Sequence, residues 1–470
     1  MEKRIAFCTL GCKLNFAETS SLARRFAEAG FRRVPFGADA DVIVVNSCSV
    51  TAQADRKCRQ AIAKAHHAAP SAMIVVTGCY AQLRAEEIGR LPGVGLVSGT
   101  GQKGQLPERV LQALGLGRPE SPGMVETLQV ASPETAPVMP DVIPSAETTP
   151  CAQGPILSPD IHLPFEGAYS LHDRSRSFLK IQDGCDYRCA YCTVPLARGN
   201  SRNASVESVV AAARQIAASG IREIVLTGVN IGDFGKTTGE SLLDLLRRLD
   251  QVEGVERYRI SSIEPDLLTD DIIAFTASSR TFMPHFHIPL QSGCDRTLTR
   301  MGRRYRRDVF VSRVETIRQW MPDAFVAADV IVGFPGETDE DFEDTLSLLR
   351  QTAPAACHVF PYSERPYTRA ADMPDKVPSE EKARRSRVLL TWSEQQKEAF
   401  YARHVGDVRR VFFESKAVDG LMTGFTDNYL RVASPFDAAS IGRTVAVVLE
   451  RVLRPGLLYG APVASPDQNQ

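Results

Sequence analysis

Three cysteines in one short segment have a spacing that suits a metal cluster. The segment GCDYRCAYCTVP begins at Gly184, ends at Pro195 and contains Cys185, Cys189 and Cys192 as C-x3-C-x2-C. One face of a helix would have the same spacing, but a glycine and a proline at the two ends indicate a loop. A zinc site or a thioredoxin-like pair is a further alternative, although no nearby Cys or His offers the fourth ligand that zinc takes. Three thiolates suit a four-iron cluster that keeps one iron open to another ligand.

Three further cysteines each follow an apolar run that predicts a buried parallel strand. The runs are Arg4–Cys8, Asp41–Asn46 and Met73–Thr77, and the cysteines that follow them are Cys12, Cys48 and Cys79. The carboxyl ends of parallel strands in an open α/β sheet meet at one crevice, where ligands bind. Because Gly11 and Gly78 directly precede two of these cysteines, tight turns can present their thiolates there. Separate burial of each cysteine is the alternative.

The number of cysteines and the lack of a targeting segment predict a protein of a reducing compartment. Their total of eleven is odd, and the sequence shows neither a signal-peptide core nor an apolar stretch of membrane-spanning length. We therefore expect a cytoplasmic protein whose cysteines serve metal or redox chemistry rather than disulfides. The formal net charge of −1 provides no general attraction to nucleic acid, so any RNA surface must be local. We interpret the remaining cysteines as packing or incidental residues: Cys8, Cys58, Cys151, Cys294 and Cys357.

The 470 residues exceed one comfortable core and predict several domains. Residues 1–116 alternate strands and helices, which is typical of an open parallel α/β sheet. Residues 117–173 are rich in Pro, Ser and Thr, and we interpret them as a flexible linker or insertion. About six strand–helix units in residues 174–403 predict a partial (β/α) barrel, and short β-like pieces in residues 404–462 predict a small β-barrel. The larger barrel's strands are expected at Phe178–Ile181, Glu223–Leu226, Tyr258–Ser261, His285–Pro289, Phe325–Val332 and His358–Tyr362.

The C-x3-C-x2-C segment resembles the signature of the radical SAM superfamily. The resemblance implies that its three cysteines hold a 4Fe-4S cluster whose open iron binds S-adenosylmethionine (SAM) and whose electron cleaves it to a 5′-deoxyadenosyl radical. Tyr191, just before the third cysteine, would pack near the adenine. Strand ends of such a barrel contact the cofactor, although ordinary loop packing is the alternative for each residue there. The positions implied to bind SAM are Gly228, Asn230, Ser261, Glu264, Gln291 and Gly333.

The leading domain makes the resemblance more specific. A Gly-Cys, an Asn-x-Cys and a Gly-Cys-x-Ala-Gln, followed by the radical SAM segment and a β-barrel tail, resemble the methylthiotransferases over almost the whole chain except the insertion. That family's architecture is an N-terminal cluster domain, a radical SAM barrel and a C-terminal TRAM domain. The resemblance implies that Cys12, Cys48 and Cys79 hold an auxiliary 4Fe-4S cluster whose open iron carries the sulfur to be transferred.

Within that family, the stretches GCKLNFAE from Gly11 and TGVNIGDFG from Thr227 resemble the MtaB type, which acts on N6-threonylcarbamoyladenosine at position 37 of tRNA. The resemblance implies that one SAM methylates the sulfur and that a second yields the radical that takes hydrogen from adenine C2. An unactivated aromatic C–H has no usable acidity, so acid–base side chains could not replace these cofactors. The expected partners are tRNA, a sulfur donor and an electron donor. The alternatives are a target in isopentenyladenosine tRNA or a ribosomal protein, or an iron–sulfur RNA-binding protein without catalysis.

A run of arginines is a candidate RNA surface. Its members could neutralise phosphates, and Tyr305 among them could stack on a base, whereas a solvated helix face is the alternative. The candidates are Arg300, Arg303, Arg304, Arg306 and Arg307, flanked by Arg296 and Arg313. The resemblance of the tail to a TRAM domain adds His404, Arg409, Arg410 and Arg431.

One further motif does not predict a nucleotide site. Residues 99–104 read GTGQKG and match the G-x-G-x-x-G pattern of dinucleotide-binding loops. A second strand with an acidic residue should follow at a set distance, but the Pro-rich stretch follows instead. We expect a turn at the edge of the domain.

Overall fold

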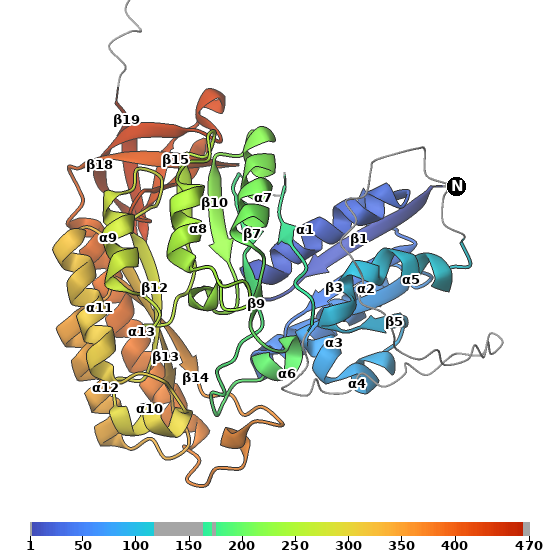
Figure 1. The fold of residues 1–470 in the computed structure, drawn as a ribbon, viewed down its shortest axis with the longest axis horizontal. Coiled ribbons are helices and arrows are strands. Elements are labelled where there is room, and N and C mark those ends of the chain that lie inside the picture. Colours follow the sequence, from blue (N-terminus) through green and yellow to red (C-terminus); the bar gives the residue numbers. More distant parts are fainter. Residues whose placement is uncertain (1, 117–162, 172–174, 464–470) are drawn as a thin grey trace, which may run out of the picture.

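The structure, a computed structural model, describes residues 2–116, 163–171 and 175–463. An N-terminal domain (blue), a central domain (green to orange) and a C-terminal barrel (red) follow one another along the chain (Figure 1). Most of the stretch predicted as a linker, including Cys151, lies outside the described residues.

The N-terminal domain is built on a five-stranded parallel sheet. Its elements are β1 (Lys3–Thr9), α1 (Lys13–Glu28), β2 (Phe31–Val34), β3 (Val42–Ser47), α2 (Ala52–Ala68), β4 (Met73–Gly78), α3 (Cys79–Leu83), α4 (Ala85–Gly89), β5 (Val94–Ser98), a 3₁₀ helix (Thr100–Gln105) and α5 (Leu106–Ala113). The strand order is β2-β1-β3-β4-β5. The three apolar runs predicted as strands are confirmed as β1, β3 and β4, whereas β2 and β5 were not foreseen.

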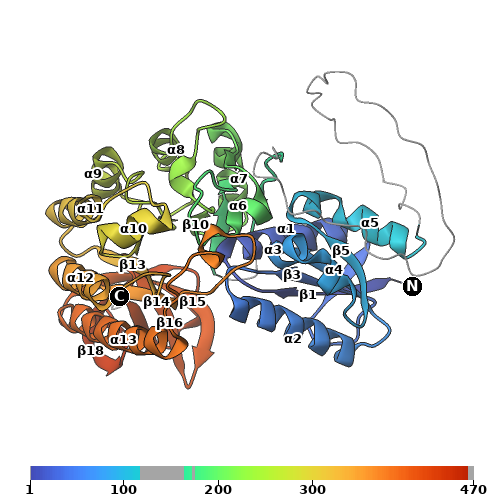
Figure 2. The same cartoon turned by 90° about the horizontal axis from the view of Figure 1, so that it is seen from below.

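Helices cover both faces of this sheet. Val42 and Val44 of β3 pack on the side of α1 and α5, whereas Ile43 and Val45 pack on the side of α2. Figure 2 shows α1 and α5 on one side of the sheet and α2 on the other. A strand buried on both faces needs apolar residues at every position, which is why its sequence is a continuous run rather than an alternation.

The central domain is a partial (β/α) barrel, as predicted. Its elements are β6 (Ala168–Tyr169), β7 (Ser177–Lys180), β8 (Gln182–Asp183), α6 (Val194–Arg198), β9 (Arg202–Asn203), α7 (Val206–Ala218), β10 (Glu223–Thr227), α8 (Leu242–Leu249), β11 (Arg257–Ile260), α9 (Asp270–Ser278), β12 (His285–Gln291), α10 (Asp295–Met301), α11 (Arg307–Trp320), β13 (Phe325–Val332), α12 (Asp339–Thr352), β14 (Ala356–Pro361) and α13 (Ser379–Ala402). Strands β7, β10 and β11 form one parallel sheet, and β12, β13 and β14 form another. One apolar core spans both sheets.

The first strand of this domain begins earlier than expected. Strand β6 pairs antiparallel with β7, so that Ala168 lies opposite Lys180 and Tyr169 opposite Leu179. Tyr169 also accepts hydrogen bonds through its carbonyl from Ser21 and Arg24 of α1. Ala168 and Tyr169 fall inside residues 117–173, which were predicted as a linker. The ordered central domain therefore begins before the predicted end of that linker.

The C-terminal domain is a closed barrel. Its strands are β15 (Val408–Val418), β16 (Leu421–Thr426), β17 (Arg431–Pro435), β18 (Thr444–Arg454) and β19 (Leu457–Pro462), in the order β15-β16-β17-β19-β18. Its core is continuous with Phe400 and Tyr401 of α13 and with Phe325 of β13. Arg257 and Arg259 of β11 also donate hydrogen bonds to the barrel carbonyls of Phe425 (2.9 Å) and Thr426 (2.7 Å). The barrel is thereby fixed against the central domain.

Candidate active site

The cysteines at 185, 189 and 192 lie in the loop between β8 and α6. The Cys192 N–H donates to the Cys189 carbonyl at 3.1 Å, which folds the loop into a turn. Two backbone N–H groups point at sulfur: that of Tyr187 at Cys185 and that of Val194 at Cys192, both at 3.4 Å. Such N–H···S contacts orient thiols as ligands and offset the negative charge of a thiolate cluster.

A glycine makes this loop possible. Gly184 has φ +70°, and a Cβ on it would lie 2.0 Å from the carbonyl oxygen of Asn200. A side chain is excluded there by both the backbone angle and the contact. Gly184 therefore lets the chain turn directly before Cys185.

Two thiols of this loop, those of Cys185 and Cys192, have raised pKa values. Burial, and then the neighbouring Cys189, raises the pKa of Cys192 to about 12, and burial followed by Cys192 raises the pKa of Cys185 further. A thiol with a raised pKa becomes a thiolate when it binds a cation, and binding then releases its proton. This donor set fits a 4Fe-4S cluster with one open iron.

The second triad collects at the carboxyl ends of three strands. Cys12 follows β1, Cys48 follows β3 and Cys79 is the first residue of α3 after β4. A Cβ on Gly11 would lie 2.9 Å from the Cys48 sulfur, so Gly11 allows the loop of Cys12 to approach it closely. Burial, and then the nearby Cys79 and Cys12, raises the pKa of Cys48 to about 12. The structure thus brings together three thiols that the sequence separates widely.

A fourth cysteine supports the second triad without joining it. Cys58 of α2 accepts a hydrogen bond from the Cys48 N–H at 3.4 Å, and its own thiol donates to the Cys48 carbonyl at 3.3 Å. The sequence predicted Cys58 as a packing residue. Its burial agrees with packing, and the two hydrogen bonds add that it positions the backbone of Cys48.

Behind Cys79 lies a buried ion network that joins two domains. Glu18 of α1 forms ion pairs with Lys103, Lys180 and Arg198. Burial raises the pKa of the Cys79 thiol, while Arg198 and Lys103 oppose that rise. Sequence reasoning missed this network because its residues lie far apart along the chain and pair only in the folded structure. The segment 99–104 that contains Lys103 is a 3₁₀ helix at the domain junction, where Thr100 donates to the Ala197 carbonyl at 2.6 Å.

Arg303 does not lie on an RNA surface. Its side chain is only 2% exposed, forms an ion pair with Glu264 and donates to the Cys189 sulfur at 3.1 Å and the Tyr191 hydroxyl at 3.3 Å. Burial raises the pKa of Glu264 to about 7, although Arg303 opposes that rise. Arg303 follows Gly302, whose left-handed conformation (φ +73°) ends α10, and its burial against the cysteine loop contradicts the prediction that it binds RNA.

The rest of the arginine run divides between buried and exposed roles. Tyr305 is also buried, and its hydroxyl donates to the carbonyls of Pro289 (2.5 Å) and Leu290 (2.8 Å), so it cannot stack on a base. Arg304 is exposed and lies over the ring of Tyr187 at 4.1 Å. The others bind within the domain: Arg300 to the Pro335 carbonyl, Arg306 to Thr299, and Arg307 to Asp344.

The residues predicted to bind SAM lie at or soon after the carboxyl ends of β10, β11, β12 and β13. The Asn230 amide and the Ser261 hydroxyl are buried and have no hydrogen-bond partner among the described residues, which suits a polar ligand. Gln182, which the sequence did not suggest, accepts the N–H groups of Val229 (2.9 Å) and Asn230 (2.8 Å) and so fixes the loop after β10.

Two other predicted SAM positions have structural contacts of their own. Gln291 has φ +65° at the bulge that ends β12. The Gly333 N–H donates to Glu337, whose carboxylate is ion-paired with Arg385 of α13. Their contact with SAM stays a prediction.

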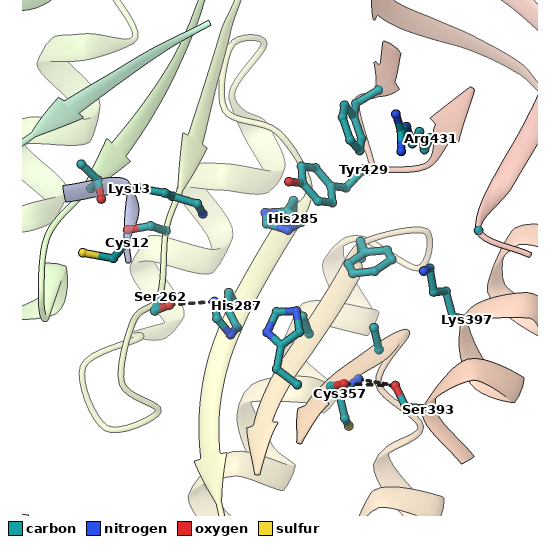
Figure 3. A pocket seen from close by; sticks show the side chains of 18 of the residues that line it. Cys12, Lys13, Ser262, His285, His287, Cys357, Ser393, Lys397, Tyr429 and Arg431 are labelled. Carbon is teal, nitrogen blue, oxygen red and sulfur yellow. Dashed lines mark hydrogen bonds between the residues drawn. The ribbon is translucent and has the colours of Figure 1, made fainter. Parts of the chain in front are cut away.

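A cavity of about 820 Å³ lies where the three domains meet. The N-terminal domain contributes Cys12 and Lys13, the barrel strand ends contribute Gly228 and Ser261 among others, and the C-terminal domain contributes Arg431. Figure 3 shows Cys12 and Lys13 on one side of this space and Arg431 and Lys397 on the other. One ligand of the predicted auxiliary cluster and two predicted SAM positions therefore border the same cavity.

Comparison with known proteins identifies the family. Residues 4–99 match the model of the uncharacterized protein family UPF0004, and residues 179–349 match the Radical SAM superfamily. The threonylcarbamoyladenosine tRNA methylthiotransferase MtaB of Bacillus subtilis is 36% identical over 97% of this chain and 95% of its own length. The chain belongs to the MtaB family of methylthiotransferases. The family predicted from the motifs is thus confirmed.

Two further relatives place the chain within this family. The MtaB enzyme of Aquifex aeolicus is 33% identical over 95% of this chain and 100% of its own length. A tRNA-2-methylthio-N(6)-dimethylallyladenosine synthase of Nocardioides is 35% identical, but over 79% of this chain and 70% of its own length. The similarity to the MtaB enzymes therefore extends over more of both chains.

The solved structures agree on the fold. The radical SAM methyltransferase TsrM of Kitasatospora setae superposes with a TM-score of 0.54 at 15% identity, covering 79% of this chain and 77% of its own. At this identity the likeness concerns the fold alone. Within the described residues, every helix is too short or too polar to cross a bilayer.

Proposed function

We propose that this protein adds a methylthio group to C2 of N6-threonylcarbamoyladenosine at position 37 of tRNA by radical SAM chemistry. The observation that carries the proposal is the cavity at the junction of the three domains, which Cys12 borders together with the strand ends of the barrel. A reaction that joins a sulfur atom to a radical carbon needs both sources beside one substrate pocket. The similarity to MtaB enzymes over almost the whole chain supports the choice of nucleoside.

Six cysteines would hold the cofactors. Cys185, Cys189 and Cys192 would bind the 4Fe-4S cluster next to SAM, and Cys12, Cys48 and Cys79 would bind the auxiliary one. When bound, these groups supply the 5′-deoxyadenosyl radical and the sulfur for C2, an atom that no acid–base side chain could activate. We propose residues 1–116 as the auxiliary-cluster domain, 174–403 as the radical SAM domain and 404–462 as a TRAM-like barrel, with 117–173 as an insertion.

The chain's own residues orient the reactants. Asn230 and Ser261 offer buried, unsatisfied polar groups to SAM, and Gln182 holds the loop that carries Asn230. Arg303 places a positive charge at the cysteine loop and holds the hydroxyl of Tyr191, the residue expected near the adenine. Burial of these groups excludes water, which protects a reactive radical from side reactions.

The proposed reaction also implies the partners of the protein. Exposed Arg304, together with Arg431 and Lys397 at the cavity, supports tRNA as the partner, because phosphates attract such cations. A sulfur donor and an electron donor must complete the cycle. We place the protein in the cytoplasm, where tRNA and reducing conditions coincide.

An anaerobic assay tests the proposal. Reconstituted protein is incubated with SAM, a strong reductant and a sulfide source, together with tRNA that carries threonylcarbamoyladenosine. Mass spectrometry of the nucleosides should show the 2-methylthio product. Parallel reactions with isopentenyladenosine tRNA and with ribosomal protein separate the alternative targets, and product in one of those alone would overturn the proposal. Failure to cleave SAM at all would favour a non-catalytic iron–sulfur protein.

A further inference from the structure

Two histidines and one aspartate form a cluster on the wall of the cavity. The Asp329 carboxylate lies 2.7 Å from Nε2 of His287 and 3.0 Å from Nδ1 of His358. Both imidazoles line the cavity, and the other nitrogen of His287 is 2.7 Å from the Ser262 hydroxyl. Figure 3 shows the contact of His287 with Ser262. Because Ser262 follows Ser261, this cluster lies beside a predicted SAM position.

The contacts leave one nitrogen available to a ligand. His287 uses both of its ring nitrogens, whereas Nε2 of His358 has no hydrogen-bond partner among the described residues. The side chain of His358 is 55% exposed. Burial would raise the pKa of Asp329, but hydrogen bonds from His287 and His358 lower it to about 2. The hydrogen bond to the Asp329 carboxylate orients the His358 ring and leaves Nε2 as the nitrogen that can contact a ligand.

The surrounding charges favour an anion in this cavity. Lys13, Lys397 and Arg431 line it, and none of them forms an ion pair within the described part of the chain. His285 also lines it, but burial, followed by Arg259 and Lys13, lowers its pKa well below the usual value, so it is neutral. Among the described lining residues Glu394 alone is acidic, and the ionised Asp329 lies behind the two histidines. A pocket with this balance attracts a negatively charged group.

The substrate of the proposed function carries such a group. An N6-threonylcarbamoyl substituent ends in a carboxylate, whereas an isopentenyl substituent has no charge. We propose that His358, oriented by Asp329, binds the carboxylate of the threonylcarbamoyl group and thereby selects this nucleoside over one with an apolar N6 substituent. This role rests on the proposed function and names the residue that recognises the N6 substituent of the substrate.

The test uses two RNAs that differ by one charge. One is an anticodon stem-loop with threonylcarbamoyladenosine, and the other carries the carboxamide in place of the threonyl carboxylate. Wild-type protein and His358→Gln are assayed with both RNAs under anaerobic conditions. A charge-assisted hydrogen bond corresponds to a preference of about tenfold to a hundredfold. Wild type should show this preference in KM, and His358→Gln should lose most of it.

Two further variants separate this role from others. Asp329→Asn should reduce the preference less than His358→Gln does, because the ring stays in place but loses its ionised partner. Lys397→Met is the matched control, because a lysine that contacts the RNA phosphates should contribute equally to the binding of both RNAs. The variant should therefore weaken the binding of both RNAs equally. If Lys397→Met instead removes the preference, the carboxylate binds at the α13 side and the proposal is wrong.

The outcomes distinguish this inference from the function on which it rests. Wild type that is inactive on the carboxylate RNA contradicts the proposed function itself. Wild type that modifies both RNAs with the same KM overturns the role of His358 but leaves the function standing. Equal losses on both RNAs in His358→Gln indicate a structural role. Elemental analysis tests whether His287, Asp329 and His358 bind a metal ion instead. If wild type holds a metal other than the iron of the two clusters and His358→Gln loses it, these three residues are a metal site and the proposal is wrong.

Discussion

The two cysteine triads reach a similar arrangement by different routes. Cys185, Cys189 and Cys192 come from one loop, and backbone N–H groups of that loop point at two of their sulfurs. Cys12, Cys48 and Cys79 come from three loops that meet only because β1, β3 and β4 are neighbours in a parallel sheet. The first triad therefore depends on local geometry, whereas the second depends on the packing of a whole domain.

The surroundings of the triads are nevertheless alike. Each has one buried arginine beside a cysteine, and a glutamate forms an ion pair with that arginine. Arg198 lies beside Cys79 and pairs with Glu18, and Arg303 donates to Cys189 and pairs with Glu264. A thiolate-bound cluster is anionic, so a fixed guanidinium offsets its charge in a buried site. An arginine held by a glutamate can therefore compensate cluster charge both in a single loop and in a crevice formed by several strands.

The largest effect is expected from the local triad. Replacing Cys185, Cys189 and Cys192 by Ala should abolish both SAM cleavage and product, because no radical forms. The iron content should fall by about half. Detection of 5′-deoxyadenosine by chromatography measures the cleavage. Retained cleavage would mean that these residues do not hold the catalytic cluster.

Replacement of the dispersed triad, the cysteines that follow β1, β3 and β4, should separate SAM cleavage from sulfur insertion. Replacing Cys12, Cys48 and Cys79 by Ala should remove the methylthio product and again about half of the iron, yet leave SAM cleavage within about threefold. Nucleoside mass spectrometry and 5′-deoxyadenosine are measured on the same samples. If cleavage disappears as well, the two triads are not independent sites.

Glu18→Gln probes the packing on which the dispersed triad relies. Loss of this carboxylate leaves Lys103, Lys180 and Arg198 with less compensation in a buried network, at a cost of about 3–5 kcal/mol in the free energy of unfolding. Urea denaturation measures it. Asp39→Asn removes an exposed ion pair with Arg4 and should change stability by less than about 0.5 kcal/mol.

The pH dependence of Glu18 has a definite sign. Burial would raise its pKa, but Arg198, Lys103 and Lys180 together hold it well below the usual value. The stabilisation is therefore fully present above the unfolded pKa of about 4.3 and is lost as the pH falls toward the folded value. The difference in stability between wild type and Glu18→Gln should shrink in this acidic range. A constant difference would contradict the ion network.

Cys58→Ala should have the smallest effect. Cys58 packs in the apolar core and hydrogen-bonds the backbone of Cys48, so its loss should leave the iron content unchanged and cost about 1 kcal/mol of stability. Iron analysis after anaerobic reconstitution provides the measurement. A loss of iron would show that four cysteines, rather than three, hold the auxiliary cluster.

Much of the fold followed from local patterns. The run Phe325–Val332 is strand β13 with the same bounds. Apolar periodicity reports such elements because each must bury one face or both. Strand β5 was missed because Gly95 interrupts its apolar pattern, and β6 because two residues carry no periodicity.

The sequence by itself determined the local triad and the order of the domains, because spacing and periodicity act over a few residues. Only the tertiary structure decided that Arg303 turns inward to Cys189 rather than outward to RNA, and that Cys12 and His358 border one cavity. Burial and charge compensation depend on partners that lie far apart along the chain, and no local pattern encodes them.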